Sequence, residues 1–173
     1  SCSPHRLCDE ILHKYSCESI LSIYMTYKGK FYPTNRKKYK GDINNIVYRS
    51  LWERKFMTYC DDNNDIVEWG SEELVVPYIS PLDGKRHRYF PDFYIKTKNG
   101  DKFMVEIKPK KYTKPPKATK TKRLTKAFMH ETTEWARNRA KWSAAHDICK
   151  RNGWKFIIIT EDHLNTTKYI YGR

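Results

Sequence analysis

One predicted hairpin restricts the possible folds of this chain more than any other part of its sequence. Segments 88–97 and 102–108 carry apolar residues at alternate positions next to a short polar turn that contains Gly100. Strand residues at alternate positions share one face, and a three-residue loop ending in glycine is a common link between antiparallel strands. The segment therefore predicts two antiparallel strands, whose register decides which polar side chains meet.

The register follows from the apolar side chains of the two strands. A loop of three residues brings them all onto one face, whereas an even number of loop residues separates them. These side chains are Phe93, Ile95, Phe103, Val105 and Ile107. The same register pairs Asp92 with Glu106, and Lys108 lies two residues beyond Glu106 on the same face. We therefore expect Asp92, Glu106 and Lys108 to lie together, on the face opposite the apolar one.

These three residues together are suited to the hydrolysis of phosphodiesters. Two carboxylates at close range repel each other unless a cation neutralises them, and Mg²⁺ binds carboxylate oxygens, water and phosphate oxygens. A neighbouring lysine can position the attacking water and offset the charge that builds on phosphorus. The alternative is an exposed hairpin face with ordinary solvated charges, because two acids and a lysine at this spacing often occur by chance.

The net charge favours a polyanionic partner. The chain of 173 residues has 34 Lys and Arg and 20 Asp and Glu, which gives a formal net charge of +14. This excess favours nucleic acid, with an anionic membrane surface as a weaker second candidate. No apolar run approaches the roughly 20 residues that span a bilayer, and no signal peptide is recognisable.

The remaining pattern predicts an α/β fold. One helix is expected to begin between residues 46 and 50 and to run to about Cys60. The other expected elements are strands at 66–69, 74–79, 88–97, 102–108 and 154–160, an irregular basic linker at 109–122, a helix at 124–152 closed by Gly153, and a short helix from Glu161. The long helix carries an apolar stripe with a spacing of seven residues: Phe128, Trp135, Trp142 and Cys149. This order indicates a mixed central β-sheet flanked by helices.

A third acidic residue is expected from the first helix. Glu53 lies on its polar face, from which the side chain can reach the hairpin. A surface glutamate paired with Arg49 is the alternative interpretation. Glu72, which follows the next strand, is the reserve candidate for the same role.

The motifs resemble a known superfamily. The segments P-D-F-Y-I at 91–95 and V-E-I-K at 105–108, with a helical glutamate upstream, are similar to the signature of PD-(D/E)xK nucleases, whose fold is restriction-endonuclease-like. Within that superfamily the chain resembles the head completion nucleases of T-even-type tailed bacteriophages. Further segments that carry this resemblance are N-N-I-V-Y-R-S-L-W-E at 44–53, E-W-G-S-E at 68–72, R-Y-F-P-D at 88–92, V-E-I-K-P-K-K at 105–111, T-K-P-P at 113–116 and K-W-S-A-A at 141–145.

The resemblance implies roles for the residues of the hairpin and the first helix. Asp92, Glu106 and Glu53 are expected to bind Mg²⁺, for which Mn²⁺ can substitute, together with the backbone carbonyl of Ile107. Lys108 is expected to act as the catalytic base or to position the attacking water. The resemblance thus implies a metal-dependent endonuclease with a restriction-endonuclease-like fold.

The resemblance also implies a biological setting. A nuclease of this family is expected to trim or protect the packaged DNA end during head completion, before tail joining, in the virion or the host cytoplasm. Its partners would be DNA and the portal or neck proteins of the phage. Two alternatives stay open, namely a TnsA-like transposon-end endonuclease and a non-enzymatic DNA-binding protein of head or neck assembly.

The basic residues near the hairpin are the expected DNA contacts. Segment 108–126 contains nine Lys or Arg and no acid, which favours attraction to phosphates. We predict contacts with DNA for Arg86, Arg88, Lys110, Lys111, Lys114 and Lys117. Arg88 is expected to share a strand face with Asp92, and His87 is a weaker candidate for assisting catalysis. Tyr112 could stack on an unpaired base, although a solvated linker is the simpler interpretation.

The first residues differ in character from the rest. We interpret residues 1–24 as a non-native or disordered extension and residues 25–173 as a single nuclease domain. Three of the five cysteines lie in the extension, at spacings that do not match the close pairs of zinc sites. The sequence indicates no oligomeric state.

Overall fold

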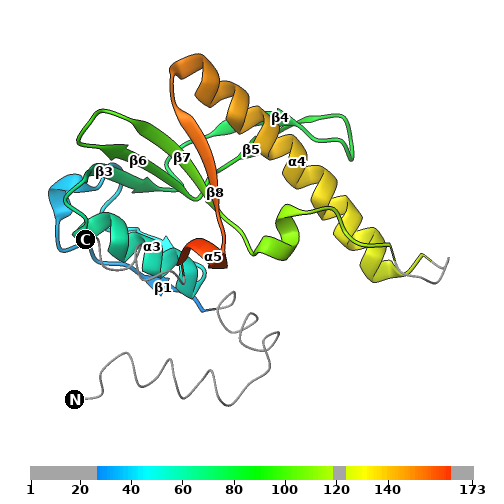
Figure 1. The fold of residues 1–173 in the computed structure, drawn as a ribbon, viewed down its shortest axis with the longest axis horizontal. Coiled ribbons are helices and arrows are strands. Elements are labelled where there is room, and N and C mark those ends of the chain that lie inside the picture. The colour runs from blue at the N-terminus through cyan, green and yellow to red at the C-terminus, as the bar shows by residue number, and fades with distance from the viewer. Residues whose placement is uncertain (1–26, 119–123, 165–173) are drawn as a thin grey trace, which may run out of the picture.

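A four-stranded mixed sheet forms the centre of the protein. The computed structural model describes residues 27–118 and 124–164 (Figure 1). The strand order is β3-β6-β7-β8, in which β3–β6 and β6–β7 are antiparallel and β7–β8 is parallel. The bounds are β3 Ile66–Ser71, β6 Phe93–Thr97, β7 Lys102–Ile107 and β8 Lys155–Ile159. The predicted α/β fold with a mixed sheet is confirmed.

Helices cover the two faces of this sheet. Helix α3 (Leu51–Asp62) packs Trp52, Phe56 and Met57 against the side chains of Phe93 and Val105. Helix α4 (Lys126–Asn152) lies on the opposite face, where Trp142 and Cys149 contact Met104 of β7. A two-stranded sheet of β4 (Val76–Ile79) and β5 (Arg86–Tyr89) packs beside α4 (Figure 1). Both faces of the hairpin strands are therefore covered.

Helix α3 begins later than the earliest predicted position. Val47–Tyr48 forms strand β2, which pairs with β1 (Gly29–Lys30), and Ser50 is the residue before the helix. Its hydroxyl oxygen accepts a hydrogen bond from the backbone N–H of Glu53 at 3.1 Å. A serine followed three residues later by glutamate is a frequent start of a helix, so this local pairing defines the boundary.

The predicted continuous strand 88–97 is wrong. The chain leaves β5 at Tyr89, passes through Phe90 and the buried Pro91, and enters β6 only at Phe93. Proline has no backbone N–H to donate to a neighbouring strand, and it restricts the residue before it. Arg88 therefore belongs to the β4–β5 sheet, and the predicted alignment of Arg88 with Asp92 on one strand does not occur.

The carboxyl-terminal third of the chain follows the predicted order. Helix α4 is preceded by Thr125, ends at a left-handed Gly153, and leads into β8 and the short helix α5 (Glu161–Leu164). Strand β8 forms the edge of the sheet, and Ile159 is its one buried residue. The apolar stripe of α4 is buried at Trp142 and Cys149, whereas the amino-terminal end of the helix extends beyond the sheet (Figure 1).

The remaining segments are short. A single 3₁₀ turn, Arg36–Lys38, lies between β1 and β2, and a second one, Lys110–Thr113, interrupts the predicted irregular linker. Residues 1–24, the predicted extension, lie outside the described residues. Within the described ranges, no helix combines the length and the apolar character that crossing a membrane requires.

Candidate active site

The register of the β6–β7 hairpin is the predicted one. Phe93 pairs with Val105 and Lys96 with Lys102, which is the pairing that a three-residue loop requires. The backbone N–H of Thr97 donates to the carbonyl of Asp101 at 2.9 Å, which closes a loop of three residues. Gly100 adopts a φ of +85° at the end of this loop. The loop thus uses glycine for the left-handed conformation that other residues reach only with strain.

Asp92 and Glu106 meet at the start of β6 and the end of β7. Oδ2 of Asp92 accepts a hydrogen bond of 2.7 Å from the backbone N–H of Ile107, next to Glu106. Burial and the negative charge of Glu106 together raise the pKa of Asp92 well above its ordinary value. Burial likewise raises the pKa of Glu106, which is only 7% exposed. The two carboxylates repel each other when both are ionised, and a bound cation would offset this repulsion.

Lys108 joins this pair as predicted. Its ammonium Nζ lies 4.0 Å from Oε1 of Glu106, and its side chain is 27% exposed. Its backbone N–H donates to the carbonyl of Ile159 at 2.9 Å, so the end of β7 is held by β8. Lys108 therefore presents a positive charge at the border between the two buried acids and solvent.

Tyr89 contacts the site from the neighbouring sheet, and the sequence analysis missed it. Its hydroxyl donates a hydrogen bond of 2.6 Å to Oε2 of Glu106, and both side chains are buried. Tyr89 lies on the inner side of β5, where it pairs with Val76 and packs towards α4. Tyr89 precedes Asp92 by three residues, so the predicted continuous strand 88–97 would place the two side chains on opposite faces.

Lys141 is a second residue near the site that the sequence pattern did not predict. It lies in α4, and its Nζ is 5.7 Å from the ring centroid of Tyr89 and 6.0 Å from that of Tyr78. Burial lowers its pKa, and the negative charge of Glu106 acts in the opposite direction. Lys141 therefore lies within electrostatic range of Glu106.

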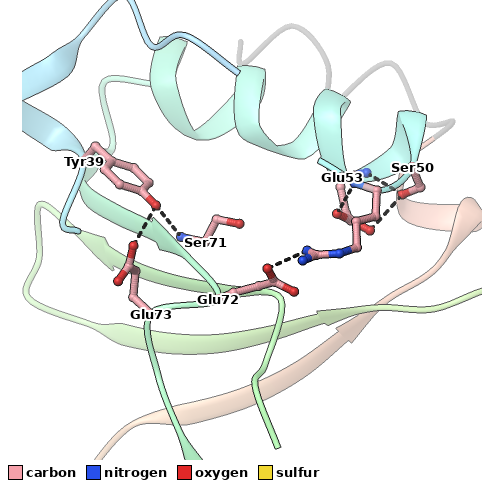
Figure 2. A network of polar contacts seen from close by, with 7 residues as sticks. Tyr39, Ser50, Glu53, Ser71, Glu72 and Glu73 are labelled. Atoms are coloured by element: carbon pink, nitrogen blue, oxygen red, sulfur yellow. Dashed lines mark hydrogen bonds and ion pairs between the residues drawn. The ribbon is translucent and has the colours of Figure 1, made fainter. Parts of the chain in front are cut away.

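Glu53 lies near the same cluster, but its carboxylate is engaged locally (Figure 2). Oε2 accepts a hydrogen bond of 2.8 Å from the backbone N–H of Arg49, and Oε1 accepts one of 3.2 Å from the hydroxyl of Ser50. Burial raises the pKa of Glu53, and its charge in turn raises the pKa of Asp92 and Glu106. Glu53 thus lies within electrostatic range of both acids, while its own oxygens are bonded to Arg49 and Ser50.

Glu72, the reserve candidate, is part of the rim of the site. Its backbone N–H donates to the carbonyl of Asp92 at 3.0 Å. Its carboxylate bonds Nη1 of Arg49 at 2.5 Å, and Figure 2 shows this contact. Its φ of +55° is unusual for a residue with a side chain. The guanidinium of Arg49 therefore pairs with Glu72, and the alternative in which it pairs with Glu53 does not occur.

The side chains alone offer only part of a metal site. In the ranges that the structure covers, no group of three or more His, Cys, Asp or Glu residues is arranged to hold a metal ion. Asp92 and Glu106 are the pair whose chemistry fits Mg²⁺. Burial raises the pKa of both carboxyl groups, and the charge of Glu106 raises the pKa of Asp92 further. Mg²⁺ binds carboxylate oxygens, with water and phosphate as further ligands.

The predicted DNA contacts are spread over two segments. Arg86 and Arg88 are exposed on β5, and His87 bonds Asp83 of the adjoining turn at 2.8 Å. Lys110 is paired with Asp162 at 2.5 Å, so its charge is partly engaged. Lys111, Lys114 and Lys117 are exposed along the linker after β7.

Two comparisons relate the chain to known proteins. Residues 63–161 match the family model described as "TnsA-like endonuclease N terminal", a range that contains Asp92, Glu106 and Lys108 but not Glu53. The chain is also 46% identical over 142 residues to the head completion nuclease of Enterobacteria phage T4, which covers 81% of this chain and 95% of that protein. The chain therefore belongs to the family of phage head completion nucleases, with a core of the TnsA-like endonuclease type.

Proposed function

We propose that this protein is a Mg²⁺-dependent DNA endonuclease that trims or protects the packaged DNA end during head completion, before tail joining. One observation carries the proposal, namely that Asp92, Glu106 and Lys108 converge in a chain whose core matches TnsA-like endonucleases. The net charge of +14 suits a DNA substrate. The T4 relative is named for head completion, which supports a role in the assembly of the phage head. In the proposal the protein acts in the virion or the host cytoplasm, with portal or neck proteins as partners.

Asp92, Glu106 and the backbone carbonyl of Ile107 would hold the metal, with Glu53 completing the ligand set. A bound Mg²⁺, or Mn²⁺ in its place, neutralises the two acids and lowers the pKa of a coordinated water. The hydrogen bond from Tyr89 fixes the orientation of Glu106, as outer partners of metal ligands usually do. Each acid is therefore held by a second group before any metal binds.

Lys108 would act on the water and the scissile phosphate. Its Nζ lies beside Glu106 and is partly exposed, so it can donate hydrogen bonds to groups that arrive from solvent. An ammonium group at this position offsets the negative charge that builds on phosphorus in the transition state. Lys141 adds a second positive charge behind Glu106, which holds that carboxylate towards its ionised form.

A second candidate is a TnsA-like endonuclease that cuts transposon ends. The match of residues 63–161 to that family model favours it. Both candidates use the same chemistry and differ in the DNA that is cut. The similarity to the T4 protein covers 142 residues, which is more of the chain than the family model matches. We therefore prefer head completion.

Cleavage of defined DNA substrates tests the proposal. The full chain is incubated with linear, circular and branched DNA in Mg²⁺ and in EDTA, beside Lys108→Met and the control Lys150→Met, which removes an equal charge from the exposed last turn of α4. We expect cleavage in Mg²⁺ alone, its loss in Lys108→Met and its retention in Lys150→Met. Binding of DNA without cleavage of any substrate would contradict the proposal and favour a non-enzymatic assembly protein.

A further inference from the structure

The β4–β5 sheet has two faces of different character. Its inner face carries Val76, Tyr78 and Tyr89, which are buried against α4. Since residues at alternate positions point to opposite faces, the cross-strand pairs Pro77–Arg88 and Ile79–Arg86 lie on the outer face. We call the set Pro77, Ile79, Arg86, Arg88 and Phe90 the outward surface.

Phe90 connects the outward surface to the candidate active site. It follows β5 directly, and its ring is 42% exposed. The guanidinium carbon of Arg88 lies 5.7 Å from the centroid of that ring, so the two side chains lie on the same side of the chain. The buried Pro91 separates Phe90 from Asp92. An exposed aromatic ring is therefore held at a fixed position two residues from a proposed metal ligand.

The outward surface combines exposed apolar groups with positive charge. Ile79 is 60% exposed, and Leu82 in the adjoining turn is 45% exposed. The two arginines face solvent, and the nearest acid of the turn, Asp83, is bonded to His87. A partner that suits this surface must offer negative charge and flat apolar faces together.

Unpaired nucleotides have this combination, because their phosphates are exposed and their bases are free to stack on aromatic side chains. A continuous duplex offers the phosphates but keeps the base faces inside its own stack. The chemistry of the outward surface therefore distinguishes between the two forms of DNA.

We propose that the outward surface binds unpaired nucleotides next to the scissile phosphate, with one base stacked on Phe90 and the neighbouring phosphates bound by Arg86 and Arg88. This inference rests on the proposed nuclease function and specifies its substrate class. The preferred substrates are DNA forks, flaps and ends whose strands are separated, and an intact blunt duplex is a poorer substrate.

Binding of paired and unpaired DNA by full-length variants tests the inference. A forked DNA and a blunt duplex of the same sequence are titrated in Ca²⁺, which prevents cleavage, with wild type, Phe90→Ala and Phe90→Trp. The control is Tyr32→Ala, because Tyr32 is also an exposed aromatic residue, at 75%, and lies in a segment for which no contact with DNA is proposed. Thermal melts of all variants show whether the fold is retained.

We expect wild type to bind the fork more tightly than the duplex, and Phe90→Ala to lose about fivefold or more of that preference. Phe90→Trp keeps an aromatic face and should retain the preference, as should Tyr32→Ala. Equal preference in wild type and Phe90→Ala, or an equal loss on fork and duplex, overturns the inference. Cleavage is measured separately, so a protein that prefers forks without cutting them would contradict the nuclease proposal alone.

Discussion

Replacing Tyr89 by phenylalanine removes one hydroxyl group and one hydrogen bond from the candidate active site. That bond joins the hydroxyl of Tyr89 to Oε2 of Glu106 at 2.6 Å, between side chains that are 4% and 7% exposed. Solvent cannot easily replace a bond at such a depth. The ring of Tyr89 stays in place against α4 in the variant, so the packing changes little.

The size of the effect follows from the charge of Glu106. A hydrogen bond to a charged group contributes about 1.5–3 kcal/mol, which corresponds to a factor of about 10 to 150 in an equilibrium constant. Outer partners of metal ligands have effects of the same size, about 10- to 100-fold in metal affinity or activity. We therefore expect Tyr89→Phe to need about tenfold or more additional Mg²⁺ for half of the maximal rate.

Initial cleavage rates over a range of Mg²⁺ concentrations measure this shift. The matched control is Tyr78→Phe, because Tyr78 is equally buried on the same inner face and its ring also lies near Lys141. A Tyr89→Phe variant with the Mg²⁺ dependence of wild type would refute the assignment of Glu106 as a ligand held by Tyr89. Equal shifts of the Mg²⁺ dependence in both variants would show that the effect comes from packing.

Three other substitutions test the local physical arguments. Asp92→Asn should raise the free energy of unfolding in EDTA at neutral pH by about 0.5–2 kcal/mol. The folded-state pKa of Asp92 is raised, so wild type loses stability as the pH rises through that pKa, and the neutral amide does not. Equal melting of variant and wild type at pH 8 would contradict this expectation. Gly100→Ala should lower the free energy of unfolding in denaturant by about 1 kcal/mol. The cost comes from the φ of +85° alone, since nothing lies within 4 Å of the added Cβ. Asn99→Ala is the control, and an unchanged free energy of unfolding in Gly100→Ala would exclude the left-handed loop. Ser50→Ala should lower the free energy of unfolding by about 1 kcal/mol, because the backbone N–H of Glu53 loses its hydrogen bond to the serine hydroxyl at the start of α3. An unchanged free energy of unfolding would show that this bond contributes nothing.

The hairpin could be predicted because its determinants are local. The length of the loop, the glycine at its end and the alternation of apolar residues act within about fifteen residues of chain. The observed pairing of Phe93 with Val105 is therefore the one that the sequence predicts, with Asp92 directly before Phe93 and Glu106 directly after Val105. Their burial was not predictable in the same way, because it depends on the packing of α4 over the polar face.

Tyr89 and Lys141 were missed for a related reason. Tyr89 reaches Glu106 only because Pro91 ends one strand and the chain enters a second sheet. Lys141 approaches from α4, which is more than thirty residues further along the chain. Alternation along one strand and spacing along one helix carry no information about how two such elements pack. Glu53 is an intermediate case, since its helix was predicted but its bonds to Arg49 and Ser50 were not.

The central claim is that Asp92, Glu106 and Lys108 hydrolyse DNA and do not merely stabilise the fold. Glu106→Gln is the most direct test, because the side chain keeps its size while it loses the charge that would bind a metal. DNA binding in EDTA and single-turnover cleavage in Mg²⁺ are measured on the same DNA for wild type and variant. We predict unchanged binding and cleavage slower by at least about 100-fold. Cleavage by Glu106→Gln at the wild-type rate would contradict the claim.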